Sequence, residues 1–235
     1  MAFDTYLNTL ALDALPLDFR WEPLDADLIW AATDEEQPRL VEALARIEVV
    51  PTYALGVACC EWVAARFASL TDTTDLRRRI EAAWAAVVDW RYARIVDVEP
   101  LPDDVPRQTA RPVWFCSHLM SRAFVDYASD DAHANTRALI MLCDHVLGRH
   151  PAFEPWLSET MRRLAARFPQ RGDGSLGSPL PRDAFDPAFG WDDAEVAAGL
   201  KRHIESLDPA RNPYLRAPQV MLDKGFAGTP YRYPA

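Results

Sequence analysis

Helical periodicity runs through most of the chain. Apolar residues recur at three- and four-residue spacing in seven segments, namely 36–48, 52–69, 75–95, 112–128, 134–148, 155–168 and 192–207. Alanine, leucine and arginine, which favour helices, fill much of these segments. No stretch alternates convincingly between apolar and polar residues; "ARIVDVEPL" (93–101) comes nearest, and we interpret it as a helix end followed by an extended linker. The pattern predicts an all-α protein, a compact bundle of about seven to nine helices.

The chain of 235 residues is long enough to bury one sizeable core. We expect residues 1–168 to form a helical domain. Residues 169–191 are rich in Gly, Pro and Ser, and we expect a long loop or linker there. Residues 192–235 should form a C-terminal helix and an irregular tail that packs on the main body, because the tail carries several aromatic residues. A string shared by 63–70 and 164–171 leaves a helical solenoid open as an alternative.

The net charge of −10 narrows the classes of partner. An acidic surface repels phosphate backbones and anionic lipids, so we expect no nucleic-acid or membrane partner. The first 20 residues lack a basic region before an apolar one, and no window is apolar enough for a membrane span. We therefore expect a cytoplasmic protein. Basic charge comes almost entirely from arginine, which together with the abundant alanine suggests a bacterial origin.

Two cysteines stand side by side within "YALGVACCEWVAARF" (53–67). On a helix, neighbouring residues point about 100° apart, so the thiols of Cys59 and Cys60 diverge and cannot share a metal or a disulfide. Free cysteine behaves as a small apolar residue. We expect this stretch to be the inside of a buried helix.

Two Cys-x-His pairs could supply the four ligands of a zinc site: Cys116, His118, Cys143 and His145. On a helix, residues two apart point about 200° from each other, so each pair should face opposite sides. We therefore predict that the sulfur and imidazole groups converge on no common point, and we expect neither a metal nor a cofactor. The three arginines at 77–79 spread around one helix and are typical of a solvated face.

The best enzyme candidate lies between residues 126 and 150. Asp126, His133, Asp144 and His145 could perform acid–base or metal-dependent hydrolysis. However, the region contains no known hydrolase motif, and "YASDDAHANT" is equally typical of a turn that caps a helix. The chain also lacks G-x-S-x-G and a phosphate-binding loop in the required context. Catalysis therefore remains an alternative, and we favour a protein that is not an enzyme.

The main functional hypothesis is a non-catalytic protein-binding module, specifically a bacterial inhibitor of the immunity or antitoxin type that neutralises a basic toxic partner. Acidic residues in two irregular segments would steer such a partner toward the surface. A second alternative is a helical protein that binds a small ligand between tryptophan-bearing helices. The expected partner-binding residues are Asp97, Glu99, Asp103, Asp104, Asp183, Asp186, Trp191, Asp192 and Asp193.

Overall fold

The computed structural model describes residues 6–22, 24–31, 37–94, 96–101, 104–148 and 150–233. The protein is an all-α bundle, as the periodicity predicts. Within the described residues the α-helices are α1 (Asp25–Ala31), α2 (Pro38–Leu44), α3 (Val49–Arg66), α4 (Thr74–Val88), α5 (Arg107–Tyr127), α6 (His133–Leu147), α7 (Phe153–Arg167), α8 (Asp193–Ser206) and α9 (Pro218–Asp223). Short 3-10 helices are η1 (Tyr6–Leu10), η2 (Leu12–Ala14), η3 (Trp90–Tyr92) and η4 (Arg182–Phe185).

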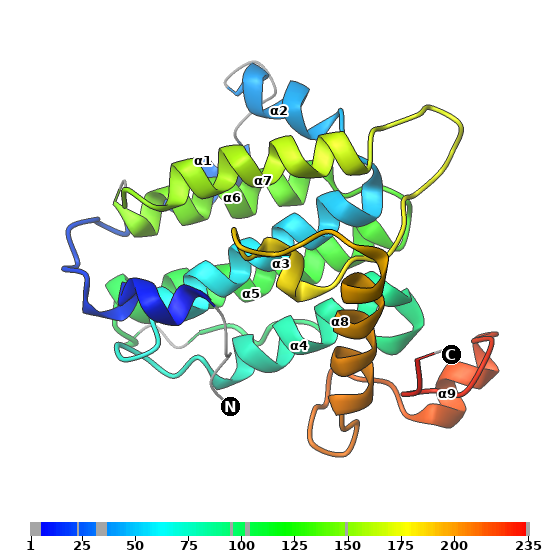
Figure 1. The fold of residues 1–235 in the computed structure, drawn as a ribbon. Helices are drawn as coiled ribbons and strands as arrows, with labels where there is room; N and C mark the ends of the chain where they lie inside the picture. Colours follow the sequence, from blue (N-terminus) through cyan, green and yellow to red (C-terminus); the bar gives the residue numbers. More distant parts are fainter. Residues whose placement is uncertain are drawn as a thin grey trace.

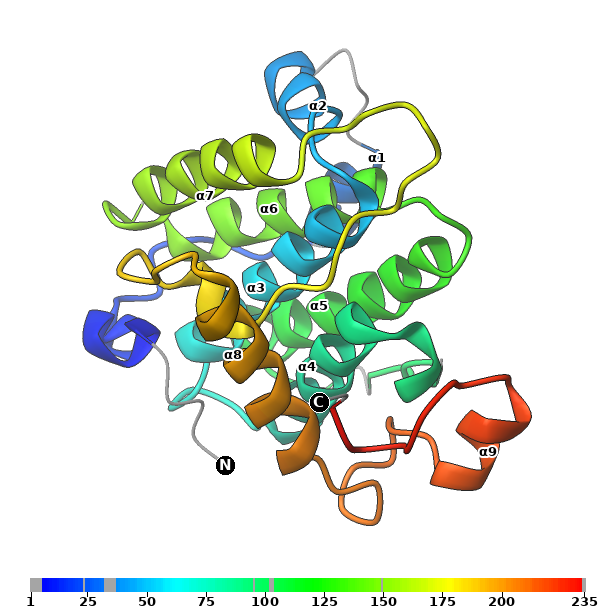
Figure 2. The same cartoon turned by 45° about the vertical axis from the view of Figure 1, so that its right-hand side comes forward.

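Helix α3 lies at the centre of the bundle, between α4, α5 and α6 (Figures 1 and 2). Every residue of α3 except Ala65 is buried, because apolar side chains cover most of the circumference of the helix. Gly56 allows α3 and α6 to approach closely. A Cβ atom at this position would lie 2.9 Å from Thr136 Oγ1 and 3.2 Å from Leu139 Cδ1.

Aromatic rings attach α7 to the central helix. The Trp62 ring of α3 lies 5.2 Å from the rings of both Phe153 and Trp156, in tilted or edge-on arrangements that aromatic pairs favour. Arg66, at the end of α3, is 1% exposed and donates hydrogen bonds to backbone carbonyls of the N-terminal segment and of α6. No helix within the described ranges has the length and apolar character that crossing a membrane requires.

The start of α5 differs from the prediction. The helix begins at Arg107, five residues before Pro112, which lies inside it. Sequence reasoning placed Pro112 in the first turn because a proline lacks the N–H that interior helical positions use. The earlier turn still forms, because Thr109 and Ala110 both donate backbone hydrogen bonds to the Pro106 carbonyl.

The long segment 169–191 crosses the bundle and contains η4, whose Phe185 is buried. After α8, residues 207–233 return to η3, where Arg94 N donates to Tyr214 O and Arg216 N donates to Tyr92 O. The small helix α9 lies at the edge of the molecule (Figure 2). These contacts join η3 and the residues that follow it to the tail.

Candidate partner-binding groove

A groove of about 400 Å³ lies where the first turns of α4 face the first half of α5, with the extended segment 96–101 along its side. We call it the acidic groove. It is lined by Thr71, Asp72, Asp75, Leu76, Arg79, Val96, Asp97, Val98, Glu99, Leu101, Ala110, Val113, Trp114, Ser117 and Tyr214.

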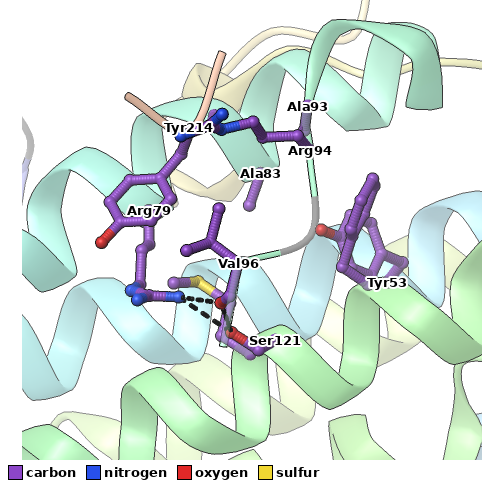
Figure 3. A pocket seen from close by; sticks show the side chains of 11 residues that line it. Tyr53, Arg79, Ala83, Ala93, Arg94, Val96, Ser121 and Tyr214 are labelled. Carbon is purple, nitrogen blue, oxygen red and sulfur yellow. Dashed lines mark hydrogen bonds between the residues drawn. The ribbon is translucent and has the colours of Figure 1, made fainter. Parts of the chain in front are cut away.

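Arg79 fixes the start of segment 96–101. Its guanidinium donates hydrogen bonds to the Val96 carbonyl at 2.8 Å, the Ser121 hydroxyl at 2.9 Å and the Asp97 carbonyl at 3.3 Å. Figure 3 shows the first two of these bonds, with the Tyr214 ring beside the arginine. The guanidinium carbon lies 4.2 Å from the centre of that ring, within the range of cation–π attraction. Arg79 is thus a buried structural cation, and the prediction of a solvated face for 77–79 was wrong at this residue.

The cavity in Figure 3 is separate and much smaller, although Arg79, Val96 and Tyr214 line both spaces. It encloses about 30 Å³, which is room for one or two water molecules. The cavity therefore has no space for a ligand of metabolite size. The acidic groove does have that space, and it is the better candidate for a binding site.

Segment 96–101 places alternate side chains on the two sides of its backbone. Val98 is half-buried in the groove, whereas Asp97 and Glu99 are exposed. The Trp114 indole holds the far part of the segment, because its N–H donates to the Glu99 carbonyl at 2.8 Å. Within the described part of the chain, the carboxylates of Asp97 and Glu99 make no hydrogen bond or ion pair.

The first turn of α4 supplies two more carboxylates. Asp75 lies 2.9 Å from Arg79 Nε and accepts a hydrogen bond from the Tyr214 hydroxyl. Hydrogen bonds from Thr74 lower the pKa of Asp72, so this carboxyl stays ionised in mild acid. With Asp97 and Glu99, the groove carries four carboxylates against the one guanidinium of Arg79. Its walls between these charges are mostly apolar.

The other acidic segment predicted to bind a partner divides into two parts. Asp183 and Asp186 line a cavity of about 320 Å³ together with Glu61 and Arg182. The remaining three residues have local structural contacts: Trp191 packs on Phe168 and Phe189, Asp192 caps α8 through the Glu195 N–H at 2.8 Å, and Asp193 pairs with Arg167 at 2.9 Å. Asp104 is exposed just before α5, and Asp103 lies outside the described residues.

Glu61 is a buried carboxylate that sequence reasoning missed. Its side chain is 7% exposed, lies 2.5 Å from Arg182 Nε and accepts a hydrogen bond from Trp84 Nε1 at 2.6 Å. Burial raises the pKa of Glu61, and the nearby Arg182 opposes that rise. Glu61 also lines a second cavity, of about 210 Å³, beside Arg77. The available signal was the one acidic residue in the mostly apolar stretch 53–67, because a buried charge requires a partner.

The four residues of the enzyme alternative lie at the two ends of α6. Asp126 accepts a hydrogen bond from Asn135 near the start of the helix, where the His133 ring lies 3.3 Å from Asp131. His145 lies twelve residues beyond His133, which is about 18 Å along the axis, and its ring contacts the Arg20 carbonyl at 2.9 Å. Its neighbour Asp144 is exposed. The structure thus brings the four side chains to no common site.

The cysteines are buried, as predicted, and the neighbours Cys59 and Cys60 each meet a cysteine from a different helix. The Cys116 thiol adjoins that of Cys60, the Cys59 thiol adjoins that of Cys143, and burial together with these neighbours raises the pKa of Cys60 and Cys143. Helical geometry separates thiols within α3, but α5 and α6 bring others against them. His118 instead stacks on Trp114, with ring centres 5.6 Å apart. In the described ranges no three His, Cys, Asp or Glu side chains are placed to hold a metal.

Comparison of the chain with protein-family models, curated proteins and solved structures finds no match.

Proposed function

We propose that this protein is a non-catalytic binding module that captures a basic segment of a partner protein in the acidic groove. The observation that supports this most strongly is that the exposed carboxylates of Asp97 and Glu99, which have no partner among the described residues, lie beside apolar side chains of the groove. Such a groove suits an extended segment in which arginine or lysine alternates with apolar side chains. The basic side chains would meet the rim, and the apolar ones would cover Val98, Leu101 and Trp114.

The charge of the whole molecule favours the same partner. A net charge of −10 attracts a basic protein over distances comparable to the Debye length, which raises the rate of encounter. The rigid attachment of segment 96–101 through Arg79 and Trp114 keeps the groove preformed, so that little ordering is needed on binding. Both features suit an inhibitor that must bind a harmful partner quickly.

Within this class we propose an inhibitor of the immunity or antitoxin type, made in the bacterial cytoplasm against a basic toxic protein. A groove of negative sign disfavours nucleic acid as the ligand. The enzyme alternative gains no support from the separation of Asp126 and His133 from Asp144 and His145. For an inhibitor, the functional outcome is loss of the partner's activity on binding, without turnover.

Affinity capture from the native host, with matched charge variants, tests the proposal. The groove variant is Asp97→Asn with Glu99→Gln, and the control is Asp144→Asn with Glu205→Gln, which removes two exposed charges outside the groove. We expect a basic protein on the wild-type and control baits, bound about tenfold more weakly by the groove variant. Expression of that protein should arrest growth, and co-expression of the wild-type chain should restore it. Equal capture by both variants, or a captured protein that is harmless, would contradict the proposal.

A further inference from the structure

Another cavity, which we call the arginine-lined cavity, adjoins the acidic groove and has the opposite charge. It encloses about 140 Å³ and is lined by Trp21, Ala26, Arg107, Arg111 and Trp114. Trp114 also lines the acidic groove, so one indole side chain separates a carboxylate-rimmed space from an arginine-lined one. The two arginines are four residues apart at the start of α5, and they therefore project from the same face of the helix.

Neither arginine is neutralised within the described part of the chain. Arg107 and Arg111 have no ion pair or side-chain hydrogen bond there, and Arg111 Nε is shielded from solvent without a hydrogen-bond partner. A buried N–H without a partner costs free energy that a ligand oxygen would recover. By contrast Arg79, on the other side of Trp114, has every guanidinium nitrogen hydrogen-bonded. The arginine-lined cavity is thus the part of this surface that lacks an acceptor.

Two tryptophans and two arginines form most of the cavity wall. Trp21 is 4% exposed and packs on Phe115 with ring centres 5.8 Å apart, so its position is fixed. Trp114 is held by its bond to the Glu99 carbonyl. A guanidinium donates two parallel hydrogen bonds to a carboxylate in one plane. A carboxylate carries one negative charge, and the neighbouring acidic groove repels it less than it would repel a doubly charged phosphate.

We infer that the arginine-lined cavity binds a carboxylate of the same partner segment whose basic side chains occupy the acidic groove. This inference rests on the proposed function. It defines the partner segment more narrowly, as a run of alternating basic and apolar residues with a glutamate, an aspartate or a free C-terminus close to one end. The acidic groove and the arginine-lined cavity together should bind a segment with both basic and acidic groups more tightly than a purely basic one.

Titration of the ¹⁵N-labelled protein with synthetic peptides tests the inference. The probes share the core Arg-Leu-Arg-Leu with blocked ends and carry one glutamate, placed one to three glycines before or after the core. Each has a twin with glutamine in place of glutamate, and inorganic phosphate is titrated separately. We expect at least one glutamate peptide to bind about tenfold more tightly than its twin and to shift the indole N–H signals of Trp21 and Trp114. Arg111→Gln should remove that tenfold difference and leave the response of the Val98 and Glu99 amides.

The outcomes separate the inference from the proposed function. If every glutamate peptide and its twin bind the groove equally, the carboxylate site is refuted and the acidic groove stands. If phosphate shifts the indole signals and no glutamate peptide does, the choice of carboxylate is refuted. If no peptide perturbs Val98 or Glu99, both the groove and the inference built on it fail. A folded Arg111→Gln variant is verified by the unchanged amide spectrum of α3.

Discussion

His203 on α8 should make the fold sensitive to mild acid. Its Nε2 atom is shielded from solvent and has no hydrogen-bond partner among the described residues. Burial, followed by the charge of Arg182, lowers the pKa of His203 from 6.5 to about 4. A hydrogen bond with the Glu81 backbone and the charge of Asp183 oppose this effect but do not reverse it. The folded protein therefore holds His203 neutral at pH values where the unfolded chain protonates it.

The size of the effect follows from the two pKa values. One pKa unit corresponds to about 1.4 kcal/mol, so the difference between 6.5 and about 4 is worth about 3 kcal/mol as an upper value. The sign follows from proton binding: below pH 6.5 the unfolded state binds a proton that the folded state does not. The stabilisation is complete above pH 6.5, is lost progressively as the pH falls, and changes no further below about pH 4.

Urea unfolding of the wild type and of His203→Asn, at several pH values from 7.5 to 4, measures this contribution. Asparagine keeps a side-chain N–H near the Glu81 carbonyl but cannot be protonated in this range. The raised pKa of Glu61 acts in the opposite direction, since it favours folding in acid, but it is common to both proteins and cancels in the comparison. We expect the wild type to lose up to about 3 kcal/mol more than the variant. Parallel curves, or a His203 ring signal that titrates near pH 6.5 in the folded protein, would refute the reasoning.

Three further substitutions test the packing around α3. Gly56→Ala should lower the free energy of unfolding, measured by heat or urea, by about 1–3 kcal/mol, because the new Cβ meets Thr136. Unchanged stability would contradict the close approach of α3 and α6. Arg66→Met should remove the donors to the N-terminal carbonyls, cost about 2–4 kcal/mol, and speed hydrogen exchange in that segment before the rest of the fold. Glu61→Gln and Arg182→Gln should be non-additive by about 1–3 kcal/mol in a double-mutant cycle, and additive effects would show that the buried pair is not coupled.

The helices could be predicted because their signal is local. Apolar spacing and helix-favouring residues give the main helices, and the mostly apolar stretch 53–67 gives the buried position of α3. The start of α5 could not be located, because an interior Pro112 opposes the usual rule and is tolerated only through neighbouring bonds. Helices α1 and α9 are short and depend on packing more than on periodicity.

The candidate site was accessible to sequence reasoning only in part. Asp97 and Glu99 belong to an irregular acidic segment, so their exposure follows from the local sequence. They lie in the same groove as Asp72 and Asp75 because Arg79 holds the segment against α4 and α5. That is a tertiary contact between residues 17 and 18 positions apart. The same limit applies to the contacts between cysteine thiols. Helical geometry separates the two thiols of α3, but the packing of α5 and α6 against α3, which the sequence does not reveal, brings other thiols next to them.

The central claim is that the carboxylates of Asp97 and Glu99 guide a basic partner into the groove, and stopped-flow association kinetics over a range of salt concentrations test it most directly. With the captured partner, the association rate of the wild type should fall steeply as salt rises. The rate for Asp97→Asn with Glu99→Gln should start lower and depend less on salt, while Asp144→Asn with Glu205→Gln should follow the wild type. Identical salt dependence for all three proteins would show that the partner binds elsewhere, and the acidic groove would then have no part in recognition.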